Sequence, residues 1–167
     1  MEVGCKKVES MKLTKIFLAV VALCALACHP NGGNEETIKW EENGTLVGEW
    51  CLTSWAGSSA AKPQVYIAFN DDSTFNLYQQ NYSVIWFHYE GNYALNNNVL
   101  TGAYSDGKEL ASEYKVDFSS DGKMIRLTSL ENSSDVAIYT ATEIPTWIIE
   151  EAKTPEKVRS VEADRFL

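Results

Sequence analysis

Catalysis needs reactive side chains that converge, and the sequence offers few of them. It has two histidines, His29 in a polar stretch and His88 in an aromatic run. If its neighbour Tyr89 and then Gly91 point into the fold, His88 points outward and has no evident partner for a catalytic pair. The sequence contains neither a G-x-S-x-G nucleophile motif nor a glycine-rich phosphate loop. We therefore expect that the protein is not an enzyme and uses no cofactor.

Several carboxylates stand in segments that are typical of turns. Asp71, Asp72, Asp106 and Asp121 lie among Asn, Ser and Gly residues, and short polar side chains favour tight turns because they bond the local backbone. No EF-hand spacing surrounds these residues, and the sequence has no C-x-x-C pair or His/Cys cluster for zinc. We predict turn roles for these aspartates and no metal site.

The four cysteines are the remaining reactive groups, and three of them lie near the start of the sequence. Cys5, Cys24 and Cys28 fall before, within or just after an apolar run at residues 16–27, which follows two lysines. A short positive region, an apolar run of this length and small residues at its end are typical of a secretion signal. Cys51 is then the one cysteine left for the folded part, so we expect no intramolecular disulfide there.

The end of the apolar run, Ala25-Leu26-Ala27-Cys28, resembles the lipobox of bacterial lipoproteins. The resemblance implies a signal peptide at residues 1–27, acylation of Cys28, and a membrane anchor in the bacterial cell envelope. It points to the outer membrane and leaves open whether the periplasmic or the surface face is used. The alternatives are plain secretion with cleavage after Ala27 and an uncleaved anchor, and the true start is either Met1 or Met11.

The charge balance excludes one class of partner. Lys and Arg number 14 and Asp and Glu 23, which gives a formal charge of −9. Nucleic-acid phosphates attract clusters of Lys and Arg, and none follows the signal. We expect no nucleic-acid partner and interpret the acidity as an aid to solubility.

The chain after the signal divides into a tether, a domain and a tail. Residues 28–43 are polar and lack a periodic apolar pattern, which predicts a flexible tether; Trp40 either docks on the domain or is exposed. From residue 46 the apolar period is two, which is typical of strands. Turn-forming residues separate the later runs. We predict strands at residues 46–55, 65–69, 75–79, 83–95, 99–104, 113–118, 123–130 and 135–142.

A short C-terminal helix is predicted after Pro145, because proline suits a first helical turn. We expect it to plug or buttress one end of the sheet. Residues 154–167 are charged and finish with Phe166-Leu167; this tail is either disordered or folded back onto the domain, which we place at residues 44–153.

This series of short hairpins predicts an all-β fold. Eight neighbouring antiparallel strands close most simply into an up-and-down β-barrel, which leaves no exposed sheet edge. A β-sandwich is the alternative, but it needs longer crossovers than most of these loops provide.

The residues at the start of the first strand carry a family resemblance. Gly48-Glu49-Trp50, followed by successive hairpins and a late helix, resembles the lipocalin/calycin superfamily. The sequence is most similar to the lipocalin-like domains of small Gram-negative envelope lipoproteins, also through residues 69–75, 91–95 and 121–125. The resemblance covers about residues 44–153. It implies that Trp50 packs across the closed end of the barrel and that Gly48 lets the chain bend there.

Typical lipocalins also carry a Thr-Asp-Tyr loop motif, which is absent here, and an arginine stacked on this tryptophan. Arg126, Arg159 and Arg165 are the candidates for that arginine.

Placing Trp50 inside fixes the inward face of every strand. The inward side chains are apolar or aromatic and none is charged, which suits an apolar ligand that tyrosine hydroxyls orient. The same side chains also suit a barrel packed shut, because eight strands leave room for little more than their own side chains. The residues predicted to bind the ligand are Trp50, Phe69, Phe75, Tyr89, Tyr93, Tyr104 and Tyr114.

Four other aromatic residues, Trp55, Tyr66, Tyr78 and Trp86, are predicted to face outward, where a contiguous patch would mark a binding surface. Two functions therefore stay open. The first is a lipid-anchored envelope protein whose barrel binds or carries a small hydrophobic ligand. The second is a non-catalytic interaction or scaffold module with a filled barrel and an external face for an envelope protein or a glycan.

Overall fold

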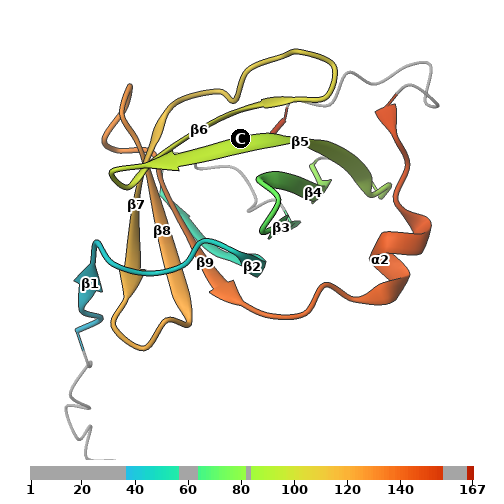
Figure 1. Cartoon of the computed structure of the whole chain (residues 1–167). Coiled ribbons are helices and arrows are strands. Elements are labelled where there is room, and N and C mark those ends of the chain that lie inside the picture. Colours follow the sequence, from blue (N-terminus) through green and yellow to red (C-terminus); the bar gives the residue numbers. More distant parts are fainter. Residues whose placement is uncertain (1–36, 57–63, 82–83, 156–164) are drawn as a thin grey trace, which may run out of the picture. The chain divides into compact units, whose positions relative to one another are not determined.

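The computed structural model describes residues 37–56, 64–81, 84–155 and 165–167 (Figure 1). The predicted signal peptide at 1–27, Cys28, most of the predicted tether and Arg159 lie outside these residues. Within them, no helix has the length and apolar character needed to cross a membrane.

The described residues from Ile38 onward form one compact unit, with nine strands and one helix. The eight predicted strands appear as β2 to β9, with ends shifted by a few residues, and the predicted helix appears as α2. The bounds are β1 Trp40–Glu41, β2 Gly48–Ala56, β3 Gln64–Phe69, β4 Thr74–Gln80, β5 Phe87–Asn96, β6 Val99–Tyr104, β7 Tyr114–Ser119, β8 Met124–Ser129, β9 Val136–Ala141 and α2 Thr146–Glu151.

The strands close into a barrel in sequence order. Each strand from β2 to β8 pairs antiparallel with the next one, and β9 pairs back onto β2. This closure gives every barrel strand two neighbours, so the sheet has no free edge along most of its length. The predicted up-and-down barrel is confirmed, and the alternative of a β-sandwich is wrong.

The turns between the strands are stabilised by asparagine and aspartate residues. Asn97 and Asn98 both have positive φ, at 50° and 61°, as a two-residue hairpin turn between β5 and β6 requires. The Asp72 carboxylate accepts hydrogen bonds from the backbone and side chain of Thr74 at 3.0 and 2.6 Å. The Asp121 carboxylate accepts them from the Ser119 hydroxyl and the Lys123 backbone. These local bonds lower the pKa of both carboxyls and confirm the predicted turn roles of Asp72 and Asp121.

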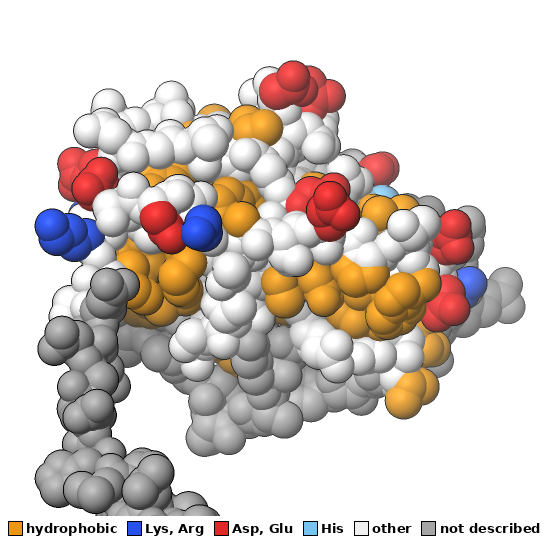
Figure 2. Space-filling model, turned by 90° about the horizontal axis from the view of Figure 1, so that it is seen from below, with side chains coloured by type: hydrophobic (Ala, Val, Ile, Leu, Met, Phe, Trp, Pro, Cys, Tyr) orange, Lys and Arg blue, Asp and Glu red, His pale blue; other side chains and the backbone are white. Residues whose placement is uncertain are grey.

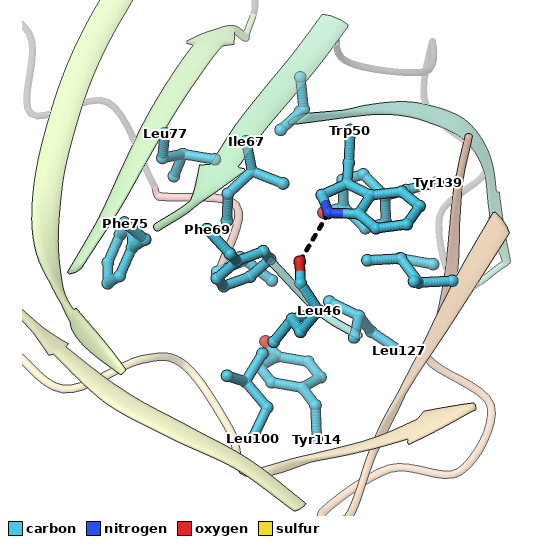
Figure 3. Packing of buried hydrophobic residues seen from close by; sticks show 14 of the residues in the cluster. Leu46, Trp50, Ile67, Phe69, Phe75, Leu77, Leu100, Tyr114, Leu127 and Tyr139 are labelled. Carbon is cyan, nitrogen blue, oxygen red and sulfur yellow. Dashed lines mark hydrogen bonds between the residues drawn. The ribbon is translucent and has the colours of Figure 1, made fainter. Parts of the chain in front are cut away.

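One end of the barrel, called the proximal end here, is closed by Leu46 and Trp50. Both side chains are buried, and the Trp50 indole N–H donates a hydrogen bond of 2.9 Å to the Leu46 carbonyl (Figure 3). Gly48 lies between them with φ at 148°, a conformation that residues with a Cβ rarely adopt. The bend expected at Gly48 and the packing expected of Trp50 are both present.

Strand β2 contains an irregularity that reverses the side of Trp55. The pairing of β2 with β9 shifts between Leu52 and Ser54, so one extra residue is inserted and later side chains change face. Trp55 is half-buried against the core, and its indole N–H donates to the Asp135 carboxylate at 2.7 Å. The prediction that Trp55 faces outward is therefore wrong, because strict alternation does not survive a bulge.

The wall formed by β4, β5 and β6 has no room for a side chain at Gly91. A Cβ placed there would lie 2.3 Å from the Ala103 carbonyl oxygen and 2.7 Å from the Phe75 ring. We expect Gly91→Ala to lower the free energy of unfolding by about 1–3 kcal/mol, because the backbone must shift. Urea denaturation measures this, with Asn92→Ala, an exposed neighbour on the same strand, as the control. Equal stability of both variants would contradict the close packing.

Helix α2 covers part of the outer wall rather than plugging an end. Ile148 in the helix and Ile144 before it pack on Ala68, Tyr78 and Trp86, side chains on the outer side of the barrel. The predicted outward aromatic residues Tyr66, Tyr78 and Trp86 do form one cluster. They are not an exposed patch, however, because α2 buries Tyr78 and Trp86 to 7% and 5% exposure.

One short segment at the border of the domain differs from the prediction. Trp40 and Glu41, placed in the tether by sequence, form β1 and pair with Ser119 and Phe118 of β7. The Arg126 guanidinium stacks on the Trp40 ring at 4.5 Å and bonds the buried Asp117 carboxylate. The tether therefore ends before Trp40, because β7 extends past the β5–β6 turn and offers β1 a free edge.

Candidate ligand-binding site

The end of the barrel opposite Leu46 and Trp50, called the distal end here, is where β2, β4 and β6 finish and β5 and β9 begin. Residues 165–167 lie at this end, next to β5 and β6 (Figure 1). Leu167 is 2% exposed and belongs to the main core, and Phe166 packs against the same core. The predicted alternative of a tail folded back onto the domain holds for these three residues.

Phe166 enters an aromatic cage. Its ring meets the Trp55 ring edge to face at 5.1 Å and lies 6.5 Å from the Tyr139 ring at a similar angle. Such edge-to-face pairs stabilise by about 0.5–1.5 kcal/mol beyond the area they bury. The bulge in β2 therefore has a role, because it turns Trp55 toward Phe166.

Two buried polar side chains bind the backbone of this segment. The Gln79 side chain is fully buried at an inward position of β4, and its Oε1 accepts a hydrogen bond of 2.9 Å from the Phe166 backbone N–H. The Tyr104 hydroxyl donates to the Leu167 backbone oxygen. Buried polar groups are costly unless they are bonded, so these two contacts help to define the site.

Arg165 sits at the rim of the site. Its guanidinium carbon lies 4.3 Å from the centre of the Tyr104 ring and 5.1 Å from that of Tyr89. Both of its terminal nitrogens bond the Asp106 carboxylate, and the Arg165 hydrogen bonds hold the pKa of that carboxyl well below its usual range. The described arginines that were candidates for stacking on Trp50 thus stack elsewhere, Arg126 on Trp40 and Arg165 on tyrosines.

The structure places the seven predicted ligand residues in one interior but at different depths. All seven belong to the main core cluster or pack against it, and Tyr93 is only partly buried. Trp50 closes the proximal end, and Phe69 and Phe75 fill the middle near Tyr93 and Tyr104 (Figure 3). Tyr104 and Tyr89 reach the distal end, where they meet Arg165. Binding by any of the seven stays a prediction.

Three buried tyrosines add polar groups to the interior. Burial raises the pKa of Tyr114 to about 12, and it also raises the pKa values of Tyr104 and Tyr139. The three rings interact electrostatically with one another. The Tyr139 hydroxyl is fully buried, and no hydrogen-bond partner for it occurs among the described residues, which is unusual for an interior hydroxyl.

Two of the surface pockets adjoin the barrel wall. One, of about 200 Å³, lies beside the rim and is lined by His88, Tyr89, Tyr104, Asp106 and Arg165 among others. A larger one, of about 540 Å³, lies where β6 and β7 diverge, and its lining includes Leu110, Leu130 and three glutamates. The first touches two of the seven predicted residues, and the second touches none of them.

The contacts of His88 are those of a packing residue on the barrel wall. It lies on the outer side of β5, as predicted, hydrogen-bonded to the Asn76 amide oxygen at 2.9 Å and stacked on Tyr78 at 4.7 Å. Burial lowers its pKa, against an opposing effect of Glu90. Within the described residues, no group of three or more His, Cys, Asp or Glu side chains is arranged to hold a metal ion.

Sequence reasoning missed four residues of the distal site: Trp55, Gln79, Tyr139 and Phe166. A signal for Gln79 was available, because strict alternation with Phe75 and Leu77 puts its polar side chain inside an apolar barrel. The alternation of buried residues in β9 would likewise have indicated Tyr139. No local pattern signals the insertion of Phe166, because that contact joins residues far apart in sequence.

A closed, eight-stranded, up-and-down barrel with an aromatic interior and a tryptophan across one end defines the lipocalin type of ligand-binding barrel. In agreement with this, the model of the lipocalin-like domain family matches residues 46–126, from the start of the first barrel strand into β8. The chain therefore contains a lipocalin-like domain. No curated protein matches the chain.

Proposed function

We propose that the protein is a lipid-anchored lipoprotein of the bacterial cell envelope whose barrel binds or carries a small hydrophobic ligand at the distal end. The observation that supports this function best is the apolar occupant of that end. Phe166 and Leu167 are held there by an aromatic cage and by two buried polar side chains. A site that accepts these apolar groups has the size and chemistry for a small hydrophobic molecule.

The rival function, an external protein- or glycan-binding face, loses its main support. The aromatic cluster on which it rested is covered by α2. Hydrophobic side chains still gather on the face shown in Figure 2, and the exposed large ones among the described residues include Val84, Ile85 and Trp147. Acidic side chains are interspersed with them (Figure 2), and no feature of this surface selects a partner.

Ligand binding is tested by tryptophan fluorescence. We expect fatty acids or sterols to change the emission, because Trp55 lies at the distal site against Phe166. The change should disappear in Trp55→Phe and persist in Trp147→Phe, whose indole is 51% exposed on α2. Oligosaccharides serve as the polar comparison. A response that survives Trp55→Phe and is lost in Trp147→Phe would overturn the interior site and favour the outer face.

Anchoring is tested through Cys28, which follows the apolar run and small residues at 16–27. We expect Cys28→Ala to move the protein from the membrane fraction to the soluble fraction, because several acyl chains hold a protein on a membrane that one chain would not. Cys51→Ala is the matched control and should leave the protein on the membrane. Membrane retention of Cys28→Ala would contradict the lipoprotein proposal.

A further inference from the structure

The chemistry of the distal site is more specific than that of an apolar cavity. Gln79 supplies an acceptor for a backbone N–H, and Tyr104 supplies a donor for a backbone oxygen one residue further on. Both side chains are buried, so each is a built part of the interior rather than a chance surface contact. The pair therefore binds the N–H of one residue and the backbone oxygen of the next, two polar groups at the ends of a short peptide segment.

Each of the two residues held by Gln79 and Tyr104 also has apolar surroundings of its own. An aromatic side chain, Phe166, lies between Trp55 and Tyr139, and an aliphatic one, Leu167, is buried in the core. The site thus recognises the amide N–H of an aromatic residue and the backbone oxygen of the aliphatic residue that follows it. A plain hydrocarbon chain has no N–H and leaves the Gln79 acceptor without the bond that Phe166 gives it.

The site also has polar capacity that Phe166 and Leu167 do not use. The Tyr139 ring lies 6.5 Å from the Phe166 ring, and its hydroxyl is fully buried and has no partner among the described residues. A buried hydroxyl of this kind is satisfied by a ligand that brings one more oxygen or nitrogen. The occupant seen in the structure therefore fills the site incompletely.

We propose that the distal end of the barrel is a binding site for apolar peptide-like molecules, and that Phe166-Leu167 occupies it as an intramolecular ligand. The ligands meant are those in which an aromatic residue with an amide N–H is followed by an aliphatic residue with a backbone oxygen. This inference rests on the proposed ligand-binding function and names its ligand class. The Arg165–Asp106 ion pair at the rim holds the intramolecular ligand in place.

The intramolecular ligand Phe166-Leu167 competes with external ligands for the distal end of the barrel. A tethered occupant acts at an effective concentration of about a millimolar, so an external ligand binds only to the fraction of molecules whose site is vacated. Removing the occupant raises the apparent affinity for an external ligand without changing the contacts that the ligand makes.

The test uses the full chain and a variant that lacks residues 165–167, titrated calorimetrically with N-acetyl-Phe-Leu and with laurate, which has no amide. We expect the shortened variant to bind the peptide at least about 10-fold more tightly than the full chain. Within the shortened variant, Gln79→Leu and Tyr104→Phe should each weaken peptide binding by about 5- to 10-fold. Gln79→Leu should weaken peptide binding more than laurate binding, because laurate has no N–H for the Gln79 acceptor.

The outcomes separate the two proposals. A shortened variant that binds laurate but not N-acetyl-Phe-Leu overturns the peptide-like ligand class and leaves the proposed function standing. A folded variant that binds neither probe overturns both. If the shortened variant does not fold, Asp106→Asn in the full chain replaces it: loss of the rim ion pair should raise peptide affinity at least about 2-fold, and an unchanged affinity overturns the intramolecular ligand.

Discussion

Trp50→Ala lowers the free energy of unfolding by about 3–5 kcal/mol, the range observed when a buried tryptophan is truncated. Trp50 is 3% exposed, it crosses the proximal end of the barrel, and its indole N–H bonds the Leu46 carbonyl. Truncation removes the packing, opens a cavity in the core and leaves a buried carbonyl without its donor. Because small domains are stable by only about 5–15 kcal/mol, the variant should be partly unfolded at physiological temperature.

Urea denaturation followed by far-UV circular dichroism measures this loss without depending on tryptophan emission. Trp147→Ala is the matched control, because Trp147 is 51% exposed on α2, and it should cost less than about 1 kcal/mol. Trp50→Phe keeps most of the packing and loses the hydrogen bond, so it should fall between the two, at about 1–3 kcal/mol. Similar losses for Trp50→Ala and Trp147→Ala would refute the closing role of Trp50.

Stability should fall steeply above pH 10, because buried tyrosines hold their protons in the folded state. Burial raises the pKa of Tyr114 to about 12 and raises those of Tyr104 and Tyr139 as well. In the unfolded chain these hydroxyls ionise near pH 10. Between these values the folded state binds more protons, so the stabilisation is complete below pH 10 and is lost as the pH rises, at up to about 1.4 kcal/mol per pH unit for each tyrosine.

Free energies of unfolding at pH 9, 10 and 11 test this dependence. Tyr139→Phe is the informative variant, since it removes one of the three titrating groups and should reduce the slope by up to about 1.4 kcal/mol per pH unit. It should not reduce stability at pH 7, because the Tyr139 hydroxyl has no partner in the described structure. A slope that is the same in both proteins would show that Tyr139 does not retain its proton.

The barrel was predictable because its signals are local. Alternating apolar residues and Asn-, Asp- and Gly-containing turns predicted β6 at its observed bounds, Val99–Tyr104, and β3 to within one residue. The inward register also followed, since the position of Trp50 fixes the alternation of its own strand and, through cross-strand pairing, of its neighbours. Hairpin topology leaves few other ways to connect such strands.

The parts that were not predictable depend on exceptions and on distant contacts. The bulge in β2 reverses Trp55 without a glycine or proline to mark it, and the insertion of Phe166 bonds it to Gln79, 87 residues earlier. The aromatic cluster of Tyr66, Tyr78 and Trp86 was predicted correctly as outward, but the sequence did not show that α2 would cover it. In each case tertiary packing decides what the local pattern leaves open.

The packing of α2 on the outer wall also predicts which outward positions tolerate amino-acid substitutions during evolution. On β5 the outward residues Glu90, Asn92, Ala94 and Asn96 are exposed, so substitutions there meet only solvent. On β3 and β4 the outward residues Ala68 and Tyr78 are buried, so both sides of these strands are constrained by packing. Over evolutionary time β5 should accept polar replacements at these four positions, whereas Ala68 and Tyr78 should change only together with Ile144 and Ile148.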